Sequence, residues 1–381
     1  MKFIHTSDWH IGRQLHHHSL LEDQRHVLAQ IVEFAVAHDV DAVVIAGDIY
    51  DRSIPPANAV ALLDEVVNRL VNELNISVIM IAGNHDGPER LGFASRQMKD
   101  SGLHIIGPLN KLLAPVRLTG KSGDAVFYGL PYADPATVRD VFDCEVSSHE
   151  AAMVKLLEQV HEDDSQGLPK VVISHCFLDG GSESESERPL SIGGADKISP
   201  SLFTPFNYAA LGHLHGPQYK GEEHVRYSGS ILKYSFSEQN QKKSVTLVEL
   251  TPSGETNIEL LPLSAMRDVR IIEGELDVLL ATGKTDLYRD DYLMVRLWDK
   301  NAILDPMGKL RDVYPNVLHL ERTGLMAKNS QLAIGREHIK KGEFDMFTDF
   351  FSQVFGEPMN EAQTAAMIDA IDELHKVESV S

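Results

Sequence analysis

Side chains that can bind hard metal ions recur in five short motifs, each placed directly after an apolar run. The candidate ligands are Asp8, His10, Asp48, Asn84, His175, His213 and His215. Short apolar runs of this kind are typical of buried strands in an α/β sheet, whose ligand sites lie in loops beyond the carboxyl ends of the strands. We therefore expect the five loops to supply one site.

The segment from Gly83 to Asp86 is the most specific of these motifs. Asn84 offers a neutral carbonyl oxygen, which completes a metal shell without cancelling positive charge. His85, its neighbour, stays free to donate a proton. Asp48 carries two carboxylate oxygens and is able to bridge two cations.

The last motif contains His213 and His215, two residues apart. In extended backbone this spacing directs side chains to opposite faces, so a loop conformation must direct the two rings onto two cations. Each motif alone has an ordinary structural explanation, such as a helix cap or a turn. All five in this order favour a metal centre.

Composition is that of a globular enzyme of two or three domains, with 381 residues, 43% of them hydrophobic and 24% charged. No apolar stretch reaches membrane-spanning length, and the chain enters a strand without a signal-peptide pattern. The two cysteines, Cys144 and Cys176, do not suggest a disulfide framework. We expect a cytoplasmic protein without a membrane partner.

The formal net charge of -21 argues against an open basic patch that binds nucleic acid unaided. A nucleic-acid substrate is still compatible with it. Two divalent cations held by neutral side chains and only two carboxylates, Asp8 and Asp48, would make the site locally positive, and phosphate would be drawn there.

Strands alternate with helical patterns through the first half of the chain, which predicts a largely parallel sheet. A second series of strands follows, and two facing sheets accommodate them all. The predicted fold is α/β, a two-sheet sandwich flanked by helices, with a small α+β capping domain and a C-terminal helical tail. The predicted domains are 1–264, 265–338 and 339–381.

The second and third regions carry no ligand cluster. For the capping domain, a lid that shapes the substrate site and a purely stabilising unit are equally supported. In the tail, Phe344, Phe347, Phe350, Phe351 and Phe355 lie mostly on one helical face. We expect a docking site for a partner helix; the alternative is that the tail packs back on the body.

We assign no catalytic or metal-binding role to two polar runs of the sequence. The alternating serines and glutamates at 182–187 predict a mobile loop. The histidines at 16–18 are interpreted as a solvated or substrate-edge loop and not as a metal site.

In their order, the five motifs resemble the signature of the calcineurin-like metallophosphoesterases over about the first 250 residues. The chain is similar, more narrowly, to the SbcD family of bacterial DNA-repair nucleases, relatives of the eukaryotic Mre nuclease. The segments 5–12, 46–51, 210–215 and 224–230 carry this narrower resemblance. The capping domain and the tail match that family by position and pattern only.

The resemblance implies two divalent metal ions, typically manganese. It assigns one ion to Asp8, His10, Asp48 and His215. It assigns the other to Asp48, Asn84, His175 and His213. A water activated by the ions would attack phosphorus, His85 would protonate the leaving sugar oxygen, and Asp86 would orient the His85 ring. Position 51 is an aspartate where archaeal relatives place a histidine that touches substrate.

The implied activity is metal-dependent cleavage of DNA, as a double-strand exonuclease and a single-strand or hairpin endonuclease. The implied partners are an SMC-type ATPase like SbcC and a second copy of the chain, in a heterotetramer. Arg13, Arg52 and Arg90 follow metal-loop residues and are candidates for phosphate contacts. Two alternatives stay open: a dimetal phosphomonoesterase or cyclic-nucleotide phosphodiesterase acting alone, and a scaffold without catalysis.

Overall fold

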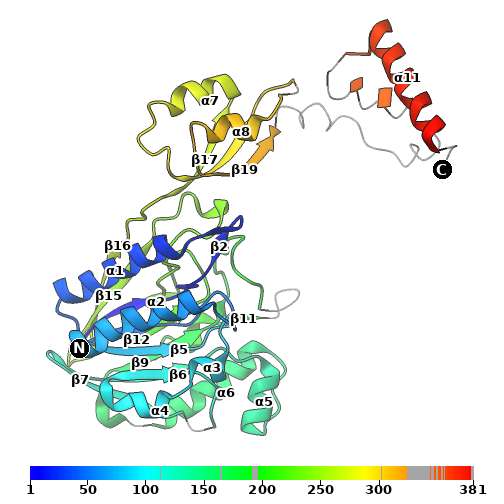
Figure 1. The fold of residues 1–381 in the computed structure, drawn as a ribbon. Coiled ribbons are helices and arrows are strands. Elements are labelled where there is room, and N and C mark those ends of the chain that lie inside the picture. The colour runs from blue at the N-terminus through cyan, green and yellow to red at the C-terminus, as the bar shows by residue number, and fades with distance from the viewer. Residues whose placement is uncertain are drawn as a thin grey trace. The chain divides into compact units, whose positions relative to one another are not determined.

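The protein divides into two compact units, Met1–Asp268 and Val269–Ser381 (Figure 1). The structure is a computed structural model. It describes residues 1–111, 113–163, 165–190, 196–301, 303–323, 344, 347, 348, 351, 352, 355 and 357–378. Each unit is described by itself below.

One six-stranded sheet of the first unit has the order β16-β15-β1-β4-β5-β6. Its parallel strands are β1 (Lys2–Thr6), β4 (Ala42–Ile45), β5 (Ser77–Ile81) and β6 (Leu103–Ile106). The strands β15 (Ser244–Leu250) and β16 (Thr256–Pro262) extend it in antiparallel pairing. The last strands of the unit therefore return to its first strand.

The other six-stranded sheet has the order β13-β14-β12-β9-β8-β7. Its parallel strands are β8 (Gly123–Leu130), β9 (Lys170–His175), β12 (Tyr208–Gly212) and β14 (Glu222–Tyr227). Antiparallel edge strands are β7 (Val116–Gly120) and β13 (Gln218–Lys220). Short pairs are β2 (Gln14–Leu15) with β3 (His18–Ser19), and β10 (Phe177–Leu178) with β11 (Lys197–Ile198).

Apolar side chains from both sheets meet in one buried core, which makes the two sheets a sandwich. Phe3 packs edge to face on Phe127, with ring centroids 5.4 Å apart, and so joins β1 to β8. The helices are α1 (Leu21–Ala37), α2 (Ala57–Asn68), α3 (Pro88–Leu91), α4 (Ser95–Met98), α5 (Pro135–Phe142) and α6 (His149–Glu162). Buried residues of α5 and α6 share a second core with the second sheet, and both lie away from α1 in Figure 1.

The direction of the strands explains where polar residues gather. Within each sheet the strands that precede the five motifs are parallel, namely β1, β4 and β5 in one sheet and β9 and β12 in the other. Their carboxyl ends lie at one edge of each sheet, so the following loops start near one another. The predicted two-sheet fold is confirmed.

The second unit contains a three-stranded parallel sheet of β17 (Val269–Gly274), β18 (Tyr292–Leu297) and β19 (Val317–Arg322). Two helices, α7 (Leu276–Gly283) and α8 (Pro306–Arg311), share its buried core. These elements form a small α+β unit, as the sequence predicts for the capping domain. The predicted domain limits at 264 and 338 stay predictions.

The C-terminal part contains α11 (Glu361–Glu378), which begins with a capping box formed by Asn360 and Gln363. Of the predicted docking residues, Phe350 lies outside the described residues. Phe351 stacks on Phe355, with ring centroids 4.4 Å apart, and Phe355 is 54% exposed. Among the described residues, no helix has both the length and the apolarity needed to cross a membrane.

Candidate metal centre

The loops that carry the predicted ligands have unusual backbone conformations. Asp8, His10 and Asp48 have φ of 52°, 44° and 50°, and His213 has φ of 108°. Residues with a side chain rarely adopt positive φ, and such conformations cluster at functional sites. The turn at His213 provides the loop conformation that the spacing of the last two histidines requires.

The structure brings the predicted ligands together in two overlapping groups. One group is Asp8, His10 and His215, and the other is Asp8, Asp48 and His175. Within each group the ligand atoms lie within 4.8 Å of one another. Asn84 Oδ1 adjoins the second group, 2.9 Å from His175 Nε2, and the His213 ring lies 5.4 Å from the His175 ring, centroid to centroid.

Asp48 belongs to the second group and also lies close to a histidine of the first. Its Oδ2 is 3.5 Å from His10 Nε2 and 3.6 Å from His175 Nε2. The Nε2 atoms of His10 and His215 face each other at 3.1 Å. One carboxylate oxygen is therefore close to imidazole nitrogens of both groups.

Glycines allow the loops to approach this closely. A Cβ on Gly83 would lie 2.1 Å from Asp48 Oδ1, and one on Gly47 would lie 2.4 Å from His175 Nδ1. Both distances are far below any van der Waals contact. The glycine before Asp48 and the glycine before Asn84 thus leave room for the side chains of the neighbouring loop.

Burial controls the charge of the cluster. Asp8, His10, Asp48, His175, His213 and His215 are all at most 3% exposed. Burial, together with the neighbouring imidazoles, lowers the pKa of His10 and of His213 well below the usual value. Burial and the Asp48 carboxylate raise the pKa of Asp8 well above its usual value.

These features fit divalent cations. Neutral imidazoles present lone pairs, and the buried carboxylates of Asp8 and Asp48 present oxygens to the same space. His10 Nε2 faces Asp48 and His215, whereas its Nδ1 is buried without a hydrogen-bond partner among the described residues and lies 3.8 Å from Asp51 Oδ1. A donor set of carboxylate, amide and imidazole without thiolate suits manganese, iron, zinc or magnesium.

His85 lies at the open side of the cluster. Its side chain is 13% exposed, and its Nε2 is 4.0 Å from Asp48 Oδ2. Its Nδ1 lies 2.9 Å from the carbonyl oxygen of Asp51, so a backbone acceptor orients the ring. Asp51 also accepts a hydrogen bond from Arg13 through its side chain.

The expectation that Asp86 orients His85 is wrong. The two carboxylate oxygens of Asp86 accept hydrogen bonds from the backbone amides of Ile49, Tyr50 and Gly83. Burial and the Asp48 charge raise the pKa of Asp86 to about 7, although the three hydrogen bonds from backbone amides lower it. Asp86 ties the loop after β4 to the loop after β5.

The serine and glutamate run at 182–187 is predicted to be a mobile loop without a role at the site, and the structure differs from this prediction. Its last residues contact the cluster: Ser186 Oγ lies 2.6 Å from His215 Nδ1, and Glu187 accepts a hydrogen bond from the His215 backbone amide at 2.8 Å. Ser186 also bonds to Glu238, which is fully buried against Lys243. Sequence reasoning missed these residues because neither a polar run nor an isolated glutamate carries a signature of such a contact.

A cleft of about 580 Å³ opens beside His85. It is lined by Arg13, Gln14, Asp51, Arg52, Ser53, Asn84, His85, Asp86 and Arg188. Arg13 donates to Asp51 and to the carbonyl of Ser186. The Arg52 side chain is 75% exposed, with its Nε 3.7 Å from Asp51 Oδ2. Arg188, which the sequence analysis did not propose, lies on the same cleft.

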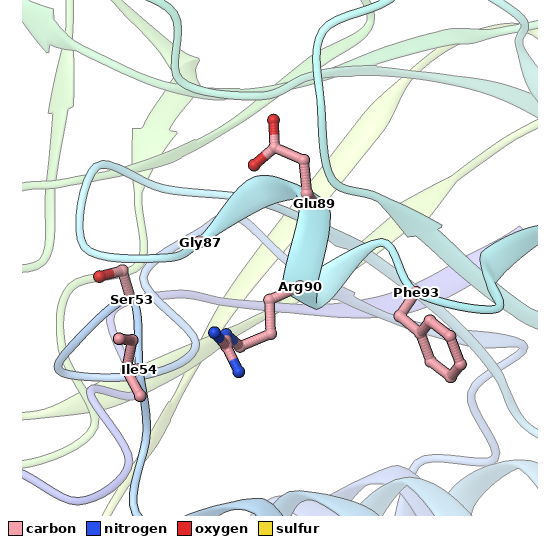
Figure 2. A pocket seen from close by; sticks show the side chains of 6 residues that line it. All are labelled: Ser53, Ile54, Gly87, Glu89, Arg90 and Phe93. Atoms are coloured by element: carbon pink, nitrogen blue, oxygen red, sulfur yellow. The ribbon is translucent and has the colours of Figure 1, made fainter.

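Arg90 lies in a separate pocket of about 650 Å³, drawn in Figure 2. Its side chain extends from α3 toward Ile54 on the facing loop, and Phe93 stands at the other side. Phe93 is 80% exposed and Ile54 is 70% exposed. The predicted phosphate contact of Arg90 stays a prediction.

A two-sheet sandwich with clustered carboxylate, amide and imidazole donors at the strand ends defines a metal-dependent phosphoesterase. A family model described as calcineurin-like phosphoesterase matches residues 1–217, more than half of the chain. A second model, described as Type 5 capsule protein repressor C-terminal domain and labelled SbcD_C, matches residues 265–355. The chain is 34% identical over 365 residues to the SbcD component of the SbcCD nuclease from Staphylococcus epidermidis, covering 96% of each chain.

The chain belongs to the calcineurin-like phosphoesterase family and, within it, to the SbcD family of SbcCD nucleases. It is accordingly a phosphodiesterase of nuclease type that works with divalent metal ions. Among solved structures, a dimetal phosphatase from Danio rerio has 12% identity and a TM-score of 0.39, covering 69% of this chain and 99% of that one. A protein from Thermus thermophilus has 14% identity and a TM-score of 0.39, covering 68% and 98%.

Proposed function

We propose that this chain is the manganese-dependent DNA nuclease component of an SbcCD-type complex that acts in DNA repair, recombination and replication. The proposed reactions are double-strand exonuclease cleavage and single-strand or hairpin endonuclease cleavage. The observation that carries the proposal is the buried cluster around Asp48, with His85 exposed to a cleft beside it.

In this proposal Asp8, His10, Asp48 and His215 hold one ion. Asp48, Asn84, His175 and His213 hold the other, with Asp48 shared. Two ions bound here supply activation of water for attack on phosphorus and positive charge for the phosphate.

His85 is the proposed general acid. The Asp51 carbonyl accepts from Nδ1 at 2.9 Å and so fixes the ring. In the imidazolium form the ring carries a second proton, on Nε2, and this is the proton proposed to transfer to the departing sugar oxygen. Arg52 and Arg188 line the same cleft with exposed side chains, so they are proposed to hold flanking phosphates. Arg13 and Arg90 are weaker candidates, because one is already bonded and the other lies in the neighbouring pocket.

The proposed partners are an SMC-type ATPase like SbcC and a second copy of the chain. The phenylalanines of the tail are proposed to dock the ATPase, because Phe355 is exposed on a stacked apolar row. The net charge of -21 implies that the isolated chain binds DNA weakly and with strong salt dependence. A cytoplasmic location stays a prediction from the sequence.

The test compares cleavage of linear duplex DNA with hydrolysis of a chromogenic phosphate monoester, with and without manganese and with and without the ATPase. Manganese-dependent cleavage of duplex, increased by the ATPase, is expected. Preference for the monoester would favour the phosphomonoesterase alternative, and absence of both activities in a manganese-loaded protein would favour a scaffold. Tight binding of DNA by the isolated chain in physiological salt would contradict the expected dependence on partners.

A further inference from the structure

A buried row of polar side chains lies behind His215, on the side away from the other ligands, and the reaction described above does not use it. His215 Nδ1 lies 2.6 Å from Ser186 Oγ and 3.5 Å from Glu238 Oε1, so the serine is the nearer of its two neighbours in the row. The Ser186 hydroxyl bonds to Glu238 Oε1, and Glu238 Oε2 lies 2.6 Å from Lys243 Nζ. Ser186 and Lys243 are each 8% exposed and Glu238 is 0% exposed.

The proton positions along this row follow from the lysine. An ammonium group has only donors, and Lys243 donates to Glu238. It also lies within 2.9 Å of the carbonyl of His215, the hydroxyl of Ser230 and the amide oxygen of Gln241. Beside this cation Glu238 is a carboxylate, which accepts at both oxygens.

The carboxylate of Glu238 determines which way the Ser186 hydroxyl donates, and the hydroxyl in turn determines which nitrogen of His215 carries the proton. A hydroxyl has one proton, and Ser186 places it on Glu238, so its oxygen is left to accept from His215 Nδ1. His215 then carries its proton on Nδ1 and presents a lone pair on Nε2. That Nε2 faces the cluster, 3.1 Å from His10 Nε2.

Other imidazoles of the site do not need such a row. His175 Nδ1 lies 2.9 Å from the Ala46 carbonyl, and His85 Nδ1 lies 2.9 Å from the Asp51 carbonyl. A carbonyl only accepts, so the backbone alone fixes the tautomer there. A serine hydroxyl either donates or accepts, so at His215 the direction depends on Glu238 and Lys243.

We propose that Ser186, Glu238 and Lys243 form a positioning relay that fixes the tautomer and ring orientation of His215 and so presents its Nε2 to the metal centre. This inference rests on the proposed function in one respect, the role of His215 as a ligand. It also gives the serine and glutamate run a role, because that run supplies Ser186. The three residues are positioning residues and touch no reacting atom.

The test uses the full chain and two independent readouts. The first is the tautomer of His215 in metal-free protein, from the ¹⁵N shifts of labelled histidine rings, assigned with His215→Gln. The second is calorimetric titration with manganese alone. The variants are Ser186→Ala and Glu238→Gln, matched by Ser182→Ala and Glu183→Gln at exposed positions of the same run.

Wild type and both control variants are expected to carry the His215 proton on Nδ1. Ser186→Ala is expected to give a mixture of tautomers and to weaken the binding of one manganese ion about 10- to 100-fold, the range typical for loss of a hydrogen-bond partner behind a ligand. A proton on Nε2 in wild type would overturn the relay. Wild-type tautomer and wild-type manganese affinity in Ser186→Ala would overturn it equally.

Glu238→Gln leaves Lys243 buried without its carboxylate, so unfolding of this variant would report the ion pair and not the relay. The double variant Glu238→Gln with Lys243→Met removes both charges, and circular dichroism checks its fold. We expect it to reproduce the weaker manganese binding of Ser186→Ala. If wild type binds no manganese, the proposed function fails, whereas two bound ions that Ser186→Ala leaves unchanged refute only the relay.

Discussion

Replacement of Asp48 by asparagine should abolish the stabilisation of the protein by metal ions. Asp48 Oδ2 is 3.5 Å from Nε2 of His10, 3.6 Å from Nε2 of His175 and 4.0 Å from Nε2 of His85. Asp48 is the one ligand shared by both proposed ions, so Asp48→Asn should empty both positions. Asparagine has nearly the same shape and keeps an oxygen for the hydrogen bond from the His85 amide.

The size of the effect follows from binding linkage. An ion at 100 times its dissociation constant stabilises the folded state by about 2.7 kcal/mol, so two independent ions contribute about 5 kcal/mol. Without ions the substitution should no longer lower the free energy of unfolding, because the Asp48 charge contributes to the raised pKa of Asp8 and of Asp86. Metal-free Asp48→Asn should therefore be at least as stable as metal-free wild type.

Urea unfolding with a chelator and with excess manganese measures both free energies, and elemental analysis counts the ions. Asp140→Asn, at an exposed position on α5, is the control and should behave as wild type does. Two ions at full occupancy in Asp48→Asn, with the full manganese-dependent gain in stability, would refute the assignment of Asp48 as the shared ligand.

His85→Ala should lower cleavage of duplex DNA about 10²- to 10⁴-fold while elemental analysis still finds two ions; loss of both ions would instead identify His85 as a ligand. Gly83→Ala should weaken manganese binding about tenfold or more in calorimetry, because its Cβ would lie 2.1 Å from Asp48 Oδ1, and unchanged affinity would contradict the close approach of the two loops. Asp86→Ala should lower the free energy of unfolding by about 1–3 kcal/mol in urea, because three backbone amides lose their acceptor, and an unchanged midpoint would contradict the tie between loops. In metal-free protein, the contribution of Asp86 to stability should be present below pH 3.8 and lost as the pH rises through about 7, because folding raises the pKa of Asp86 to about 7. The urea midpoints of wild type and Asp86→Asn should diverge over this range, and parallel pH profiles would contradict the prediction.

The fold was accessible from the sequence because local patterns carry it. Apolar runs ahead of Asp8, Asp48 and Asn84 predict buried parallel strands, and strand direction then brings their loops to one edge. The same local reasoning predicts the elements of the small unit from β17 to β19. Local patterns could not predict the pairing of β15 with β1, because nothing in either strand specifies a partner more than 200 residues away.

Residue types identified the candidate ligands but not the contacts behind them. Asp86 stands next to His85 in the sequence, yet its oxygens bond to amides of two loops, a geometry that depends on how β4 and β5 pair. Glu238 lies in an unremarkable stretch and reaches His215 both through Ser186 and by a longer direct contact of 3.5 Å. Such contacts join segments that no spacing rule relates.

The attachment of the serine and glutamate run matters for anyone who redesigns this protein. Segments of this composition are commonly trimmed or replaced by neutral linkers to help crystals grow. Here the two ends of the run differ: Ser182 and Glu183 are exposed, whereas Ser186 is buried beside an imidazole of the cluster. Edits confined to the first two residues should be harmless, but a deletion that includes the last two would yield a well-folded crystal specimen with an altered active centre.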